Sequence, residues 1–290
     1  MQWRRPRAAW VAVAVLAAAA WTFWPPPACW RGSDKYSLPH MRLTVFAIFK
    51  NEGEVLEEWL NHYVEEGADR FVLVDNDSTD NATVPARYLG MVRRFYDPRP
   101  RIQHEWLQND LAGLRTVGTA WVLPLDMDEF VFATDPNKRL VDVLEEQSCW
   151  TSRIQLESLR FGDSGRKKQP ASVRLGFVRR ARDIDPDTTK TVARPERVAK
   201  FYTHRPRMRN LVLDRPRWTD ALQLNHYGSQ TLERWRRVQM TRGDAAPDGH
   251  VDKPRDEAEF ARKNRNDVAD YALASRVLRR KGLAAFENNE

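Results

Sequence analysis

An apolar strand, an amphipathic helix and a second apolar strand follow one another near residues 42–74, and this succession constrains the fold most. Residues 42–49 and 70–74 are both rich in valine, isoleucine and phenylalanine, which is typical of buried strands. Between them, apolar residues recur at helical spacing until Gly67, a helix stop. A strand, a helix and a strand in this order predict a parallel sheet with helices on both faces. Further strands are predicted at residues 91–96 and 120–126.

The second half of the chain has a less regular pattern. Residues 140–147 predict a helix, and residues 152–161 predict a strand. A loop follows at residues 162–170, and a short strand is predicted to begin at Leu222 and to enter a loop at Gly228. Charged, amphipathic stretches predict helices over the last part of the chain, at residues 231–243 and 256–282.

Composition places the chain among globular proteins. It has 290 residues, of which 42% are hydrophobic and 30% are charged, enough for one large domain or two small ones. The formal net charge of +7 would suit nucleic acid, an anionic membrane surface or a phosphorylated substrate, although a solvated basic surface is the ordinary explanation. No zinc-finger spacing and no basic-aromatic RNA-binding string occurs, so no nucleic-acid partner is predicted.

An uncharged stretch at residues 8–24 follows three arginines near the N-terminus. As a helix it would span roughly 25 Å, slightly less than a hydrocarbon core, and tryptophans near its ends suit the membrane interface. Basic residues before the stretch favour a cytosolic N-terminus. We therefore expect a cytosolic tail at residues 1–7 and a signal anchor at residues 8–24, giving a single-pass type II membrane protein. A cleavable signal peptide is the alternative.

Three consecutive prolines and no periodicity mark residues 25–40 as a stiff stalk, so the folded domain is expected at residues 41–290. The two cysteines, Cys29 and Cys149, do not make a disulfide framework, and free thiols are the default expectation.

Polar clusters follow three of the predicted strands. They are Lys50–Glu52 (Lys50, Asn51 and Glu52), Asp75–Asp80 and Asp126–Glu129. Because ligands of open parallel sheets bind at the carboxyl ends of the strands, the three clusters indicate one shared site. An acidic site suits an anionic ligand only with a cation between them, and oxygen ligands suit Mg²⁺ or Mn²⁺.

The acids after the strand "WVLPL" are the main metal candidates. In an extended chain Asp126 and Asp128 would point the same way, about 6–7 Å apart, so a shared ion requires a turn or a bridging water. Taken alone, such a pair is more often part of a loop. His226 also follows a short apolar stretch, and its imidazole would suit Mn²⁺ as a third ligand.

Several segments in order resemble glycosyltransferase family 92, the DUF23-like proteins. Residues 46–81 resemble the opening of that family, and "WVLPLDMDEF" resembles its W-x-x-x-x-D-x-DEF signature. "LRFGDSG", "KTVARPERV" with "THRP", and "NHYGSQTLERW" with Arg242–Gly243 resemble its later motifs. The resemblance runs from about Phe46 to Gly243 and implies a GT-A fold with a UDP-sugar donor.

The resemblance also implies roles for single residues. Asp126 and Asp128 would hold Mn²⁺ (or Mg²⁺) against the donor's diphosphate, and His226 would complete the metal site. Asp75 or Asn76 would meet the uracil or the ribose. Two basic residues, Lys190 and Arg194, would meet phosphate, although a surface role suits them equally.

Family 92 inverts the anomeric carbon, which implies direct displacement with a carboxylate base opposite the diphosphate. Asp163 in the glycine-flanked loop is the first candidate, and Glu157 and Glu129 are the others. A glycan or glycoconjugate hydroxyl would be the acceptor, galactose is the donor sugar best known for the family, and a eukaryotic chain would act in the Golgi.

The sequence departs from the family after its H-Y pair, where Gln230 and Thr231 replace the usual basic residue and serine. This departure concerns acceptor specificity more than chemistry. Two other classes stay open at this stage. One is a phosphohydrolase built around the D-x-D, and the other is a noncatalytic protein that binds membrane surfaces through its basic C-terminal helices.

Overall fold

The computed structural model describes most of the chain beyond the predicted stalk. The described residues are 41–100, 102–103, 105–109, 118–148, 150–202, 204–209, 215–241 and 255–286. The predicted anchor, the stalk and both cysteines lie outside them. In these ranges no helix combines the length and the apolar character that crossing a membrane requires.

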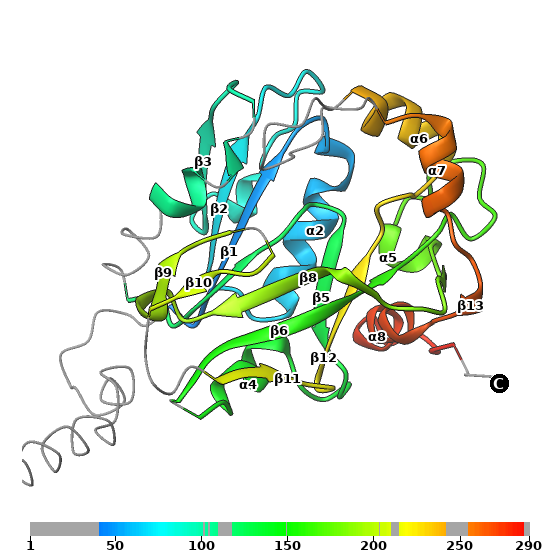
Figure 1. The fold of residues 1–290 in the computed structure, drawn as a ribbon. Helices are drawn as coiled ribbons and strands as arrows, with labels where there is room; N and C mark the ends of the chain where they lie inside the picture. Colours follow the sequence, from blue (N-terminus) through cyan, green and yellow to red (C-terminus); the bar gives the residue numbers. More distant parts are fainter. Residues whose placement is uncertain are drawn as a thin grey trace, which may run out of the picture.

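The first half folds as the sequence predicts. Four parallel strands lie side by side in the order β3-β2-β1-β4 (Figure 1). They are β1 (Leu43–Phe49), β2 (Arg70–Asp75), β3 (Val92–Tyr96) and β4 (Trp121–Pro124). Helix α2 (Gly53–Glu65) joins β1 to β2. After α2, Gly67 adopts a left-handed φ of 90°, and a Cβ there would lie 2.3 Å from Val141, so only glycine fits.

The second half adds antiparallel pairs to a sheet in which parallel pairs still predominate, as the sequence predicts. From β4 the order continues β8-β6-β12-β5, with β8 antiparallel to both neighbours and β12 antiparallel to β5. β11 pairs with the first part of β6, and β12 pairs with its last part. The strands are β5 (Glu129–Ala133), β6 (Thr151–Arg160), β8 (Asp185–Ala193), β11 (Arg215–Trp218) and β12 (Leu222–His226).

A tight turn forces the sheet to curl. β5 follows β4 directly in sequence, yet three strands separate them in the sheet. In a flat sheet four strand spacings would place them roughly 19 Å apart. The turn between them is closed by a 3.1 Å hydrogen bond from the Glu129 N–H to the Asp126 carbonyl oxygen. The sheet therefore bends until β5 lies near the end of β4.

Alternate residues of the central strands face two separate cores, as the pleat of a strand requires. Val45, Ala47 and Phe49 of β1 pack with α2, whereas Phe46 packs on the opposite face. That opposite face is covered partly by a small hairpin, which contributes Val198. The hairpin consists of β9 (Val198–Lys200) and β10 (Arg207–Met208), and a second pair consists of β7 (Arg179–Arg180) and β13 (Val268–Ala269).

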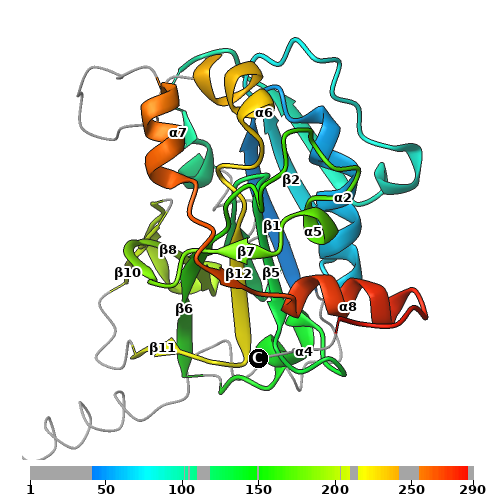
Figure 2. The same ribbon diagram turned by 90° about the vertical axis from the view of Figure 1, so that its right-hand side faces the viewer.

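Shorter helices gather at the two ends of the sheet. Figures 1 and 2 show α6 and α7 at one end and α4 and α8 at the other. The α-helices are α4 (Leu140–Glu145), α5 (Val173–Gly176), α6 (Leu232–Arg237), α7 (Glu257–Lys263) and α8 (Ala272–Arg280). The 3₁₀ turns are η2 (Ala86–Tyr88), η3 (Pro195–Arg197) and η4 (Gln239–Thr241).

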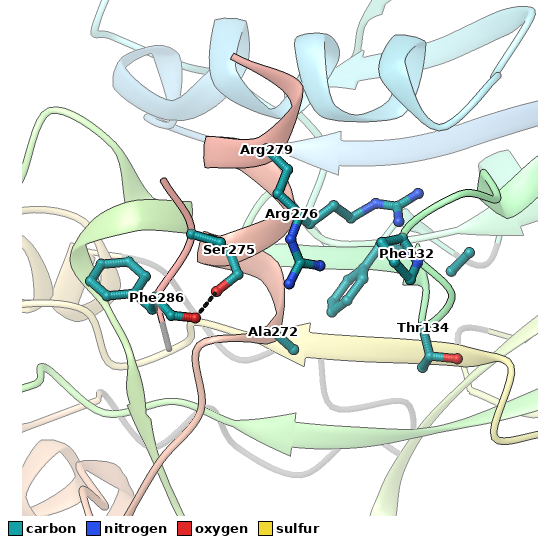
Figure 3. A pocket seen from close by; sticks show the side chains of 10 residues that line it. Phe132, Thr134, Ala272, Ser275, Arg276, Arg279 and Phe286 are labelled. Atoms are coloured by element: carbon teal, nitrogen blue, oxygen red, sulfur yellow. Dashed lines mark hydrogen bonds between the residues drawn. The ribbon is translucent and has the colours of Figure 1, made fainter. Parts of the chain in front are cut away.

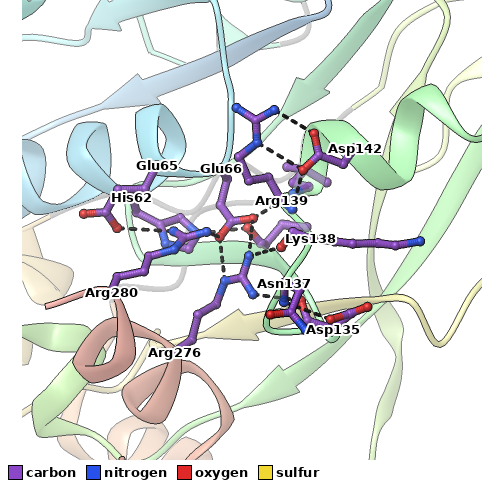
Figure 4. A network of polar contacts seen from close by, with 12 residues as sticks. His62, Glu65, Glu66, Asp135, Asn137, Lys138, Arg139, Asp142, Arg276 and Arg280 are labelled. Carbon is purple, nitrogen blue, oxygen red and sulfur yellow. Dashed lines mark hydrogen bonds and ion pairs between the residues drawn. The ribbon is translucent and has the colours of Figure 1, made fainter. Parts of the chain in front are cut away.

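A buried ion pair attaches α8 to the rest of the domain (Figure 4). Glu66, at the end of α2, is fully buried, and its carboxylate accepts a 2.8 Å hydrogen bond from Arg276 of α8. The same carboxylate accepts a 2.7 Å hydrogen bond from the Leu140 N–H at the start of α4. Arg280 adds a second ion pair at 2.8 Å. One carboxylate thus connects three helices.

The helix predicted over residues 256–282 is divided into α7 and α8. Between them, the side chains of Asn264 and Asn266 accept hydrogen bonds from the backbone N–H groups of Asp163 and Ser164. These tertiary contacts hold residues 264–266 outside any helix, so the charged pattern does not continue as one helix.

Candidate functional site

The acids of the D-x-D lie in the turn between β4 and β5. Met127, between them, is fully buried and anchors the turn to the core, the Asp126 side chain is 44% exposed, and Asp128 is buried. The Trp59 indole N–H donates to the Asp126 carbonyl oxygen at 3.2 Å. The Tyr227 N–H donates to the Asp128 carbonyl oxygen at 2.8 Å. The turn that a shared ion would require is therefore present and fixed from both sides.

Lys190 of β8 lies behind this turn. Its ammonium is 2.8 Å from Asp126 Oδ2 and 3.0 Å from Glu129 Oε2, and its side chain is 2% exposed. Glu129 also accepts a 2.9 Å hydrogen bond from the Asp126 N–H. The three side chains thus form a closed ring around the first residue of the turn. The structure places the Lys190 ammonium against carboxylates rather than at an exposed phosphate position.

Burial and charge oppose one another in this ring. Burial raises the pKa of Glu129 to about 7, although the Lys190 ammonium acts to lower it. Burial acts to lower the pKa of Lys190, but the Asp126 and Glu129 carboxylates outweigh burial and raise this pKa above its ordinary value. The ammonium therefore stays charged. Burial acts to raise the pKa of Asp126, and the Lys190 ammonium overcomes this and lowers it.

His226 ends β12 directly beside the turn. Its Nε2 lies 3.6 Å from Asp128 Oδ1, and in the sheet register it pairs with Glu129. Burial lowers the pKa of His226, but the Asp128 carboxylate raises it above the ordinary value. A Cβ on Gly228 would lie 2.9 Å from the imidazole, so glycine there gives the ring its space. The structure thus brings His226 and Asp128 together as the sequence predicts.

The ends of β1 and β2 meet beside one another, as expected for parallel neighbours. Lys50 Nζ lies 3.2 Å from Asp77 Oδ2. The Asn51 N–H donates to Ser78 Oγ at 3.0 Å, and the Thr79 N–H donates to Asn51 Oδ1 at 2.7 Å. Asn51 and Asp77 both have left-handed φ angles, 55° and 65°. Asparagine and aspartate adopt such conformations more readily than most residues, and here they form the turns at the ends of the two strands.

Asp75 and Asn76 hold the protein's own loops. The buried Asp75 carboxylate accepts hydrogen bonds from the Ser78 N–H at 2.9 Å and from Arg94 at 2.5 Å. The Asn76 side-chain amide donates to the carbonyl oxygens of Asp97 and Arg99 at 2.7 and 2.8 Å. A uracil or ribose contact stays a prediction for both residues, and the structure gives each side chain a structural partner.

Glu52 and Arg194, two further polar candidates near strand ends, also have partners within the fold. Glu52 is 2% exposed and lies 3.7 Å from the guanidinium of Arg234 on α6. The Arg194 guanidinium lies 4.2 Å from the centroid of the Trp121 ring and donates to the Thr151 carbonyl oxygen. Arg194 therefore supports β4 and β6 here.

The three candidate bases occupy different environments. Glu129 is 3% exposed and belongs to the ring around Asp126. Glu157 is exposed and lies opposite Thr189 on the neighbouring strand. Side chains alternate along a strand, so Thr189 and Glu157 lie on the face of the sheet opposite to the one that carries Lys190. This placement corrects the expectation for Glu157. Asp163 accepts hydrogen bonds from the side-chain amides of Asn264 and Asn266 at 2.8 and 3.0 Å.

The sequence does not predict one contact at the D-x-D turn and one buried ion pair between helices. Gln103 Nε2 lies 3.4 Å from Asp126 Oδ1, and it comes from a segment without any periodic pattern. Arg234 is 1% exposed and forms a 2.6 Å ion pair with Glu54, which connects α6 to α2. A charged residue in an amphipathic helix reads as solvated surface, and nothing in the sequence marks this arginine as buried.

A divalent ion finds suitable donors at this turn. Asp126, Asp128 and His226 supply carboxylate oxygens and an imidazole nitrogen, which suit Mn²⁺ or Mg²⁺. Among the described residues, however, no three His, Cys, Asp or Glu side chains are already gathered around a common metal position. The residues fit an ion that takes one or two protein carboxylates and completes its coordination with phosphate and water.

A separate cavity of about 520 Å³ lies away from this edge (Figure 3). It is lined by Ala133, the last residue of β5, by Thr134, which follows it, and by residues of α8, including Arg276 and Arg279. β5 begins at Glu129 and ends at Ala133, so the cavity lies at the end of the strand opposite the D-x-D turn.

Curated relatives are glycosyltransferases by name, although no family model matches the chain. A glycosyltransferase family 92 protein of Ricinus communis is 26% identical over 215 residues, 67% of this chain and 36% of that protein. One from Oryza sativa subsp. japonica is 29% identical over 169 residues, 53% of this chain and 27% of that protein. The resemblance seen in the motifs is confirmed, and the chain spans roughly a third of the length of these relatives.

Solved glycosyltransferase structures show partial similarity. One is the mannosyltransferase PcManGT from Pyrobaculum calidifontis in complex with GDP-Man and Mn²⁺, with 19% identity, a TM-score of 0.31, and 49% of this chain and 45% of that chain covered. Another is a glycosyltransferase involved in the glycosylation of the major capsid of PBCV-1, with 12% identity and a TM-score of 0.26. This similarity covers 52% of this chain and 59% of that chain.

Proposed function

We propose that this chain is a metal-dependent, inverting glycosyltransferase of the GT-A type. It moves a sugar from a nucleoside diphosphate to a hydroxyl of a glycan or glycoconjugate. The observation that carries the proposal is the fixed Asp126–Asp128 turn at the carboxyl edge of the parallel strands, with His226 beside it. The similarity to family 92 proteins supports the same class.

The diphosphate of the donor and a Mn²⁺ or Mg²⁺ ion would meet at this turn. Asp126 and Asp128 are the residues that would hold the ion, and His226 would complete the protein's share of the coordination. When bound, the ion neutralises the negative charge that develops on the leaving diphosphate. Within the protein, Glu129, Lys190 and the Trp59 indole keep Asp126 in place for that contact.

The nucleoside would lie over the ends of β1 and β2. There, Lys50 and Asn51 contact the Asp77–Thr79 turn, while Asp75 and Asn76 hold the surrounding loops. We propose UDP as the nucleotide and galactose as the sugar, because family 92 is best known for that donor. This choice is the finer part of the proposal, and a donor screen decides it.

Transfer with inversion is a direct displacement. The acceptor oxygen forms a bond to the anomeric carbon as the bond from that carbon to the diphosphate oxygen breaks, and a carboxylate takes the acceptor's proton. Asp163 is our candidate for this base, since the amides of Asn264 and Asn266 orient its carboxylate. Glu129 is buried and accepts a hydrogen bond within the D-x-D turn, and Glu157 points away from this turn, so neither is preferred as the base.

A base at position 163 gives a specific expectation. Asp163→Asn should lower kcat by about 10²- to 10⁴-fold while leaving the donor KM nearly unchanged, because the base acts in the transition state. Steady-state rates of nucleotide release at varied donor concentration measure both. A wild-type kcat in this variant would show that Asp163 is not the catalytic base and only stabilises its loop.

The central experiment is a donor screen that measures UDP or GDP release with Mn²⁺ and a panel of acceptor glycans. Asp126→Asn should abolish release without unfolding, since the Asp126 side chain is 44% exposed. Asp220→Asn, at an exposed turn away from the site, is the matched control and should keep full activity. Full activity in Asp126→Asn would refute the proposed function.

A further inference from the structure

We propose that Lys190 makes binding of the divalent ion conditional on the donor's diphosphate. The inference rests on the proposed function and adds a role for a residue that touches neither ligand. The buried ammonium acts as a built-in cation that partly satisfies the acidic turn, so a free metal ion gains little there. The diphosphate offsets the ammonium's charge, and metal and donor then bind together.

The geometry places the ammonium on the inner side of the turn. Lys190 is 2% exposed, whereas the Asp126 side chain that it contacts is 44% exposed. Asp126 Oδ2 meets the ammonium at 2.8 Å, and Gln103 lies 3.4 Å from Oδ1. One oxygen is therefore occupied from the interior, and the 44% exposure of the side chain lets a cation approach the carboxylate from the solvent side.

Charge around the turn gives the ammonium its effect. Asp126, Asp128 and Glu129 bring three carboxylates to four consecutive residues, and Lys190 is in contact with two of them. His226 faces Asp128, and His204 on the neighbouring loop has a lowered pKa, because it is partly buried and Lys190 opposes a second positive charge. Lys190 is therefore the dominant fixed positive charge among these groups.

A positive charge this close to Asp126 opposes the approach of a second cation in a partly desolvated site. The diphosphate carries negative charge to the same place and relieves that opposition. By linkage, the ion must then strengthen diphosphate binding as much as the diphosphate strengthens ion binding. The protein would thus avoid holding a metal ion when no donor is present.

The test measures Mn²⁺ binding to the full chain by calorimetry and by electron paramagnetic resonance, with and without saturating UDP. Wild type should bind Mn²⁺ weakly alone and more tightly with UDP. K190Q should bind Mn²⁺ alone at least about tenfold more tightly and gain less from UDP, because the opposing charge is gone. K190R, which keeps the charge, should behave like wild type.

A reciprocal variant separates charge from structure. At pH 8, above the raised pKa of Glu129, E129Q removes a negative charge while Lys190 stays, so it should bind Mn²⁺ more weakly than wild type, and K190Q/E129Q should return toward the wild-type affinity. A merely structural role would weaken binding in all three variants. If K190Q does not fold, K190M takes its place, because it also removes the charge and keeps a side chain of similar length: tighter Mn²⁺ binding without UDP supports the inference, and unchanged or weaker binding overturns it.

Different results would refute the role of Lys190 and the proposed function. Unchanged or weaker Mn²⁺ binding in a folded K190Q overturns the role of Lys190 and leaves the proposed function intact. Wild type that binds no Mn²⁺ with either UDP or GDP would refute the proposed function, and the inference with it.

Discussion

At the scale of single residues, Gly228 decides where the His226 imidazole can lie. A Cβ at this position would come within 2.9 Å of Nε2, the atom that faces Asp128. A methyl carbon essentially never approaches another heavy atom so closely, so the ring would have to move away. The sequence "NHYGS" shows the glycine but not this contact, because the contact depends on the path of the chain after β12.

We expect Gly228→Ala to displace the imidazole and to lower Mn²⁺ affinity in the presence of UDP by about tenfold, a loss typical of disturbed metal-site geometry. Calorimetry with UDP and Mn²⁺ measures it. The thermal midpoint should fall only slightly, because the added methyl group would meet only the partly exposed His226 ring. Unaltered metal affinity would show that His226 does not contribute to the site.

His62 is a buried histidine unrelated to the site. Its Nε2–H donates to the Val131 carbonyl oxygen at 2.9 Å, and the ring packs edge-on against Phe130. Burial, with a smaller effect from Arg174, lowers its pKa well below 6.5. In the folded protein His62 therefore stays neutral at pH values where the unfolded chain takes up a proton.

Because protons then bind only the unfolded state, His62 should make the protein less stable as the pH falls below about 6.5. The loss should approach about 1.4 kcal/mol for each pH unit. Urea unfolding of wild type and His62→Gln at pH 8.0 and 5.5 measures it, and the variant should lose less stability between these values. Equal losses would mean that His62 titrates alike in both states.

At the scale of elements, the contact between α2 and α8 depends on one buried carboxylate. Glu66 is fully buried, and Arg276 of α8 is 4% exposed. Breaking a buried pair by removing one charge leaves the other without compensation in a low-dielectric environment. Glu66 also binds the start of α4, so α4 and α8 should lose stability together.

Glu66→Gln should therefore destabilise the fold by about 3–5 kcal/mol, measured by urea unfolding. The double variant Glu66→Gln with Arg276→Met should recover part of this loss, since no buried charge is left unpaired. Glu257→Gln, which breaks the exposed pair with Arg236, is the control and should leave the free energy of unfolding nearly unchanged. A similar small effect at Glu66 would contradict the role of this pair.

At the scale of the whole molecule, the predicted division into a membrane anchor, a stalk and a domain stays a prediction. A chain without residues 1–40 should fold and keep its unfolding midpoint, because β1 begins at Leu43 and already pairs with β2 and β4. The full chain should sediment with membranes in an expressing cell, and the shortened chain should not. Soluble full chain with residues 1–40 intact would refute the anchor.

Local pattern determined much of this protein. The strands near residues 42–49 and 70–74 follow from continuous apolar runs, which are typical of strands buried on both faces, and the helix between them follows from helical periodicity. The strand near residues 91–96 was also predicted, although its residues are partly or fully exposed. Parallel neighbours share a carboxyl edge, so the polar clusters after β1, β2 and β4 were also predictable. The motifs further indicated the family resemblance that the curated relatives confirm.

Only the tertiary structure decided what these polar residues contact. The sheet becomes mixed after β4 because β8 pairs antiparallel with β4 and β6, and the register of β5 with β12 places His226 beside Asp128. Lys190 reaches Asp126 only because β8 inserts between β4 and β6. Such contacts join residues tens of positions apart, and no local periodicity encodes them. The sequence therefore specified the candidate side chains, and long-range strand pairing decided which of them meet.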